Sequence, residues 1–208
     1  MLGRIVHSPR PAAPRMPNAA YALYMVGLLL GEASRAGFVP AGVSLAALWT
    51  DGPWLWMAGV AYVLCFLYFG TRLSLSDIAV HRLPNRLVAR WAGASAALLL
   101  LISVLRGNVV DLLWAGLGLL LLGGGYLLVA VLGRGAMGMG DVKLAGVLGL
   151  NLGYFSLGSL LLATLFAFVT ASLVVLGGML LRKLSMKSHV PFGPFMILGA
   201  AIALGMTP

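Results

Sequence analysis

Two aspartates stand out in a sequence that has few other acidic side chains. Asp77 lies in the segment 76–85 and Asp141 in the segment 138–143, each beside a long apolar run, and the chain has only five acidic residues in all. Charge within a bilayer is costly and is seldom kept without a use. Two carboxylates on neighbouring membrane helices can share a proton, activate a water molecule and so hydrolyse a peptide bond. The pair therefore predicts an intramembrane aspartyl protease.

The composition places the chain among membrane proteins. Charged residues make up 9% of its 208 residues, against roughly 25% in soluble domains. The net charge of +9 comes from basic residues in short gaps between apolar runs, which is the pattern of topology signals. We therefore expect the lipid bilayer to be a partner and nucleic acid not to be one.

Apolar segments long enough to cross a bilayer predict an all-α, polytopic transmembrane bundle of about 6–7 spans. The predicted spans are 18–37, 54–75, 87–105, 109–132, 140–155, 156–181 and 190–206. The first contains Glu32 and Arg35, and the fifth is short. We expect residues 1–17 to form a basic, proline-rich tail and residues 18–208 to form a single membrane domain.

The distribution of charge predicts the orientation. With a cytoplasmic N-terminus, twelve of the fourteen basic residues lie on the cytoplasmic side and only Arg35 and Arg106 lie outside, as the positive-inside rule requires. Among the acids, Asp77 and Asp141 then lie at the cytoplasmic end, and the others lie outside: Glu32, Asp51 and Asp111. We therefore expect a multi-pass protein of the inner or plasma membrane whose site faces the cytoplasm.

Residues near the aspartates are consistent with a catalytic site, but each aspartate could also have a purely structural role. Gly138 and Gly140 would free the backbone before Asp141 and allow close approach of another segment. Pro84 and Asn85 predict the start of a helix. Each aspartate could instead cap a helix or pair with a nearby cation, Asp77 with Arg82 and Asp141 with Lys143.

No metal or cofactor is predicted. Cys65 is the single cysteine of the chain, which excludes an internal disulfide and a site with several thiolate ligands. His81 and His189 are too dispersed to form a convincing metal site.

Three segments, in order along the chain, resemble type IV prepilin peptidases. Residues 138–144, Gly-Met-Gly-Asp-Val-Lys-Leu, resemble the family's GxGD motif. Residues 77–88 resemble the segment that carries its first catalytic aspartate, and residues 190–195, Val-Pro-Phe-Gly-Pro-Phe, are similar to the stretch that opens its last helix.

This resemblance implies a role for each matching residue. Asp77 and Asp141 would be catalytic, Gly138 and Gly140 would shape the loop, and Lys143 would tune its neighbour. The resemblance would also place three residues beside the substrate strand, namely Pro191, Gly193 and Pro194.

The resemblance also implies a substrate. A short basic leader that ends in glycine would be removed from a type IV prepilin or pseudopilin at the cytoplasmic face. Longer members carry paired Cys-x-x-Cys zinc ligands and methylate the new N-terminus. This chain resembles the compact members that lack this region, so methylation is not expected.

Two other classes of function stay open. A proton-coupled transporter or channel would use the two acids as a relay, with acids at mid-membrane and inverted repeats. A non-catalytic scaffold of a pilus or secretion machine would keep its function when both aspartates are replaced.

Overall fold

The structure is a computed structural model that describes residues 47–50, 52–133, 138–181 and 191–206. Within these ranges the regular structure is helical throughout, which confirms the all-α prediction. The predicted tail at 1–17 and the predicted span at 18–37 lie outside the described residues. The helices are α2 (Ala47–Thr50), α3 (Pro53–Val80), α4 (Asn85–Arg106), α5 (Val110–Leu132), α6 (Met139–Phe155), α7 (Leu157–Leu180) and α8 (Gly193–Gly205).

Each predicted span from 54–75 onward coincides with one of these helices. Four helices, α3, α4, α5 and α7, are long and apolar enough to cross a membrane. α6 has 17 residues and α8 has 13, so both are shorter. The main difference from prediction concerns α3, which continues to Val80 and therefore includes Asp77 in its last turns.

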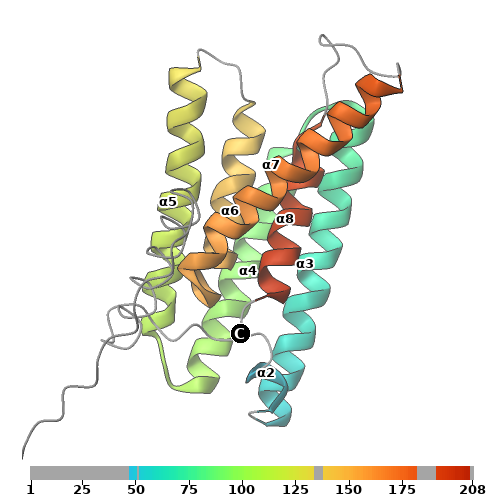
Figure 1. Cartoon of the computed structure of the whole chain (residues 1–208). Coiled ribbons are helices and arrows are strands. Elements are labelled where there is room, and N and C mark those ends of the chain that lie inside the picture. Colours follow the sequence, from blue (N-terminus) through green and yellow to red (C-terminus); the bar gives the residue numbers. More distant parts are fainter. Residues whose placement is uncertain (1–46, 51, 134–137, 182–190, 207–208) are drawn as a thin grey trace, which may run out of the picture.

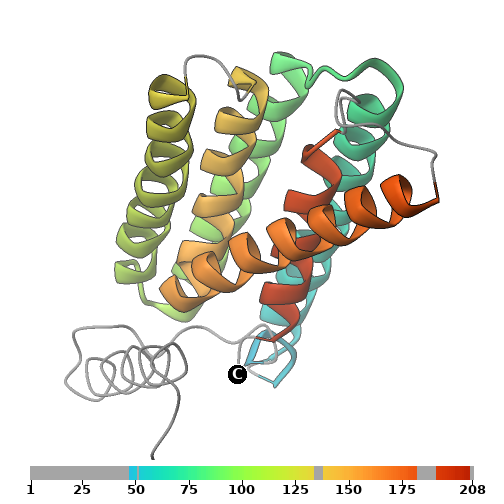
Figure 2. The same ribbon diagram turned by 45° about the horizontal axis from the view of Figure 1, so that its top comes forward.

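α6 lies at the centre of the bundle, in contact with α4, α5, α7 and α8, while α3 packs against α4 and α8. The last turns of α3, α5 and α7 and the first turns of α4, α6 and α8 lie at the same end, at the top of Figure 1. α7 is strongly inclined to the other helices (Figure 2). Because Asp77 ends one helix and Asp141 begins another, this up-and-down order brings both to one end.

Glycines let α5 and α6 approach each other backbone to backbone. A Cβ on Gly118 would overlap the backbone of Gly149, and a Cβ on Gly153 would lie 2.8 Å from the Cα of Gly118. Small residues at helix interfaces are typical of membrane bundles, where close packing replaces the hydrophobic driving force between helices. The contact fixes α6, and with it Asp141, against the neighbouring span.

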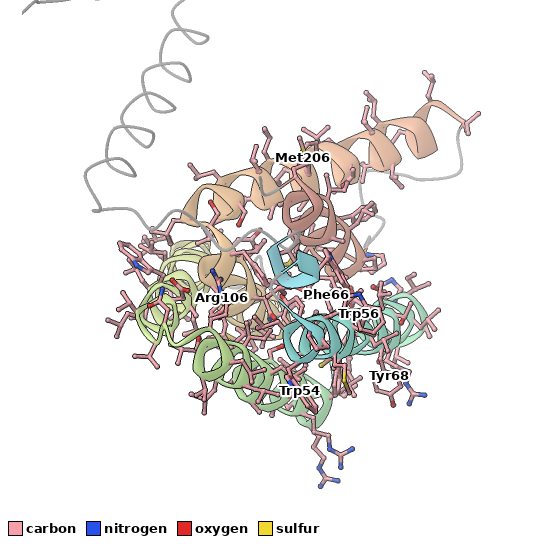
Figure 3. All side chains as sticks on the ribbon, turned by 90° about the horizontal axis from the view of Figure 1, so that it is seen from below. Trp54, Trp56, Phe66, Tyr68, Arg106 and Met206 are labelled. Carbon is pink, nitrogen blue, oxygen red and sulfur yellow. The ribbon has the colours of Figure 1, made fainter. Side chains whose placement is uncertain are left out.

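The outer surface of the bundle is apolar. Large side chains such as Leu64, Leu113 and Leu173 are exposed on α3, α5 and α7. Figure 3, which views the end opposite the aspartates, shows Trp54 and Tyr68 at the periphery and Arg106 nearer the centre. An apolar exterior on long helices is suited to contact with lipid, where helices satisfy all their backbone hydrogen bonds internally.

Candidate active site

Asp77 is buried between α3 and the start of α8. Its side chain is only 6% exposed, and its Oδ2 accepts a hydrogen bond of 2.9 Å from the backbone N–H of Gly193. Gly193 is the first residue of α8, where backbone N–H groups have no partner within the helix. The carboxylate of Asp77 therefore caps α8 from a different helix.

This contact requires glycine at position 193. A Cβ there would lie 2.7 Å from Oδ2 of Asp77 and 3.3 Å from its Cγ. The first distance is shorter than a non-bonded carbon–oxygen contact allows, so any other side chain would displace the carboxylate. Gly193 therefore contacts the carboxylate of Asp77 directly and leaves no room for a Cβ.

Asp141 is half-buried in the first turn of α6. Its backbone N–H donates to the carbonyl oxygen of Gly138 at 3.0 Å, and a carboxylate in this turn interacts favourably with the helix dipole. Gly138 itself has φ −67° and ψ 139°, a conformation open to any residue, so this glycine is not needed for its backbone freedom.

Gly140 is needed for close approach instead. A Cβ on Gly140 would lie 3.0 Å from Cβ of Leu83 and 3.3 Å from its Cδ1. Leu83 belongs to the connection between α3 and α4, so that connection rests directly on the first turn of α6. The predicted role of the glycines in close packing fits Gly140 and not Gly138.

Both aspartates line one cavity of about 290 Å³. Its walls are completed by His81, Arg82, Leu83, Asn85, Gly138 and Gly140. The cavity therefore lies between the connection that follows Asp77 and the helix start that carries Asp141. Two carboxylates on one cavity are the groups that general acid–base hydrolysis by an activated water molecule requires.

The electrostatics of the pair differ from those of two separate acids. Burial, and secondly the negative charge of Asp77, raise the pKa of Asp141 to about 6. Asp141 lies in the first turn of α6, and α6 is not among the four helices that are long and apolar enough to span the membrane. A second carboxylate that raises the pKa of the first is the arrangement by which two acids come to hold one proton.

The alternative pairings with cations are not present in the described part of the chain. Lys143 does not pair with Asp141; its Nζ donates a hydrogen bond of 2.9 Å to Oδ1 of Asn85. Arg82 lines the cavity but forms no ion pair with Asp77 among the described residues. The described side-chain hydrogen bond of Lys143 is therefore to Asn85, and a role of Lys143 in tuning Asp141 stays a prediction.

The other candidate residues lie farther from the cavity. Pro191 and Pro194 are half-buried and do not line it; Pro194 lines a separate groove with Gly70 and Ser74 of α3. Asp111 is buried at the opposite end of the bundle, where it accepts a 3.2 Å hydrogen bond from Asn108. Within the described ranges, no group of three or more His, Cys, Asp or Glu side chains is arranged to hold a metal ion.

Sequence reasoning did not single out Leu83, and it treated Asn85 only as a helix start. α4 does begin at Asn85, but the Asn85 side chain binds Lys143. His81 ends α3 in the left-handed conformation, with φ 51°, and its N–H donates to the carbonyl oxygen of Asp77 at 2.8 Å. No local signal marks the contacts of Leu83 with Gly140 and of Asn85 with Lys143, because each depends on the packing of distant segments.

The apolar helices and the cavity with two carboxylates define a multi-pass membrane protein with a paired-acid site at one end of its bundle. The chain belongs to the type IV leader peptidase family, whose model matches residues 64–180. The matched region contains both Asp77 and Asp141, so the family resemblance inferred from the motifs is confirmed.

Two curated relatives with similar sequences are named as prepilin leader peptidases. A prepilin leader peptidase/N-methyltransferase of Dickeya chrysanthemi is 31% identical over 154 residues, covering 72% of this chain and 53% of the relative. One of Pectobacterium carotovorum subsp. carotovorum is 31% identical over 179 residues, covering 81% of this chain and 56% of the relative. The chain thus spans about half the length of these relatives. No solved structure matches it.

Proposed function

We propose that this protein is a membrane-embedded aspartyl endopeptidase that removes the short basic leader of a type IV prepilin or pseudopilin. The observation that carries the proposal is the shared cavity: Asp77 from α3 and Asp141 from α6 both line it. The family and the names of the curated relatives support the substrate class. The proposal covers the peptidase step alone.

The two carboxylates would divide the chemistry. In the proposed scheme Asp141, whose pKa is raised by burial and by the charge of Asp77, carries the shared proton, and Asp77 acts as the base. Asp77 takes a proton from water as the water oxygen attacks the scissile carbonyl carbon, while Asp141 gives its proton to the carbonyl oxygen. When the tetrahedral intermediate collapses, the C–N bond breaks. The proton from Asp77 goes to the leaving amine, and the hydroxyl proton of the intermediate returns to the pair.

The orientation of the site is part of the same proposal. At the end of the bundle that carries the aspartates, the exposed cations include Arg72, Arg82, Arg86 and Arg90. Arg106 lies at the other end, at the close of α4. By the positive-inside rule, this distribution supports an inner- or plasma-membrane protein whose cavity opens toward the cytoplasm.

A transporter or channel has less support. Asp77 lies near the end of α3 and Asp141 in the first turn of α6, whereas acids of a relay are expected along the path through the bilayer. The scaffold alternative makes a different prediction, namely that neither carboxylate matters for function.

A leader-cleavage assay tests the proposal. Purified protein in lipid is mixed with a prepilin-like peptide whose basic leader ends in glycine, beside the Asp77→Ala and Asp141→Ala variants. Wild-type protein should cleave after the glycine and both variants should not. Asp111→Asn is the matched control, because Asp111 lies at the opposite end, and it should retain cleavage. Folded wild-type protein that cleaves no pilin-type leader would contradict the proposal.

A further inference from the structure

The connection between α3 and α4 is held against the start of α6 at two points. Leu83 packs on Gly140, where an added Cβ would lie 3.0 Å from the Cβ of Leu83. Two residues farther along, Oδ1 of Asn85 accepts the 2.9 Å hydrogen bond from Nζ of Lys143. The connection between α3 and α4 is thereby attached to the first residues of α6, which include Asp141.

Lys143 is not placed to act on Asp141 directly. Residues two apart on a helix point in different directions, so a lysine at 143 faces away from the carboxylate at 141. Its observed partner instead lies 58 residues away in the sequence. Asn85 is also a wall of the cavity, so this hydrogen bond links the wall to α6.

We infer that Lys143 and Asn85 form a latch, and that Lys143 is a positioning residue for the proposed cleavage. The inference rests on the proposed function. Asp77 is coupled to the latched connection through its carbonyl oxygen, which accepts the N–H of His81 at 2.8 Å. Releasing the latch allows residues 81–85, and with them the last turn of α3, to shift relative to α6. The separation of the two carboxylates then varies, although Gly193 still binds Asp77.

The latch predicts a loss that falls on the chemical step. A misplaced carboxylate lowers the turnover rate, whereas the binding of the substrate elsewhere on the protein is retained. Both side chains are exposed, and exposed hydrogen bonds contribute modestly, so the expected loss in kcat is about three- to tenfold.

A double-mutant cycle measures the latch. Lys143→Met and Asn85→Ala should each lower kcat with little change in KM, and the double variant should lose no more than either single one. Arg86→Met, which removes a neighbouring exposed cation, is the control and should match the wild type. The pH dependence of kcat/KM should be unchanged in Lys143→Met.

Three results would overturn the latch. The first is additive losses in the double variant, and the second is an equal loss in Arg86→Met, which would indicate a general charge effect. The third is a shifted pH dependence in Lys143→Met, which would mean that Lys143 acts on the charge of the aspartates.

A measurement without substrate separates failure of the latch from failure of the proposed function. Spin labels are attached at Arg82→Cys and Met139→Cys in a Cys65→Ser background, because these two positions are exposed on either side of the cavity. The distance distribution should be narrow with Lys143 present and broader in Lys143→Met. An unchanged distribution would refute the latch, whether or not the wild type cleaves a leader.

Discussion

The backbone N–H of Gly193 donates a 2.9 Å hydrogen bond to Oδ2 of Asp77, joining residues that are 116 positions apart. Asp77 thus contacts the start of α8 and also lines the cavity. Because the free N–H groups of a helix start favour a negative charge, α8 holds this side chain in place. The Pro-Phe-Gly-Pro stretch is therefore tied to the candidate site through its glycine.

Replacing Gly193 by alanine should lower leader cleavage by about tenfold or more, because a small misplacement of a reacting group has a large effect on rate. The added Cβ would lie 2.7 Å from Oδ2 of Asp77. Gly205→Ala is the matched control on the same helix, since a Cβ at that position meets nothing within 4 Å. Initial rates of cleavage compare the two. Equal rates would mean that the Asp77–Gly193 contact is not used.

The activity should depend on pH near the pKa of Asp141. Burial, followed by the charge of Asp77, raises that pKa to about 6. Below this value Asp141 keeps the proton that the proposed mechanism gives to the carbonyl oxygen of the substrate. Above it Asp141 loses that proton. We therefore expect kcat/KM to fall as pH rises through about 6, with the apparent value belonging to the pair.

An infrared titration of the carboxyl groups would check the cause of the shift. In Asp77→Asn the charge of Asp77 is absent, so the pKa of Asp141 should move down toward its ordinary value while the contribution of burial remains. A pKa of Asp141 that is the same in both proteins would show that the two carboxylates do not interact.

Gly149→Ala should destabilise the protein, because its Cβ would overlap the backbone of Gly118 and force α5 away from α6. Overpacking of this kind costs about 1–3 kcal/mol. Gly124→Ala, on α5, meets nothing within 4 Å and serves as the control. Thermal unfolding in detergent should give a lower midpoint for Gly149→Ala alone. Equal midpoints would contradict the close contact of the two helices.

Chelators should leave cleavage unchanged, because the proposed chemistry uses two carboxylates and water without a metal ion. The assay is repeated after dialysis against EDTA, with and without added zinc. Activity lost to EDTA and restored by zinc would require a metal-assisted mechanism instead.

The sequence predicted most of the helical architecture and singled out the two aspartates that line the cavity. Long apolar runs and short basic gaps are local properties, so every predicted span from 54–75 onward coincides with a helix. Asp77 and Asp141 could be selected because acids are rare in such a chain. Their placement at one end followed from the up-and-down order of the helices.

Only the tertiary structure decided how these residues are held. The burial of Asp77 against Gly193, the contact of Leu83 with Gly140 and the Lys143–Asn85 hydrogen bond each join segments far apart in sequence. Local sequence suggested Arg82 and Lys143 as ionic partners of the aspartates. In the structure Asp77 instead accepts a hydrogen bond from the backbone N–H of Gly193 in α8. Lys143 in α6 donates to the side chain of Asn85. Hydropathy and charge fix where the chain crosses the membrane, but the orientation of each helix about its axis depends on all its neighbours at once.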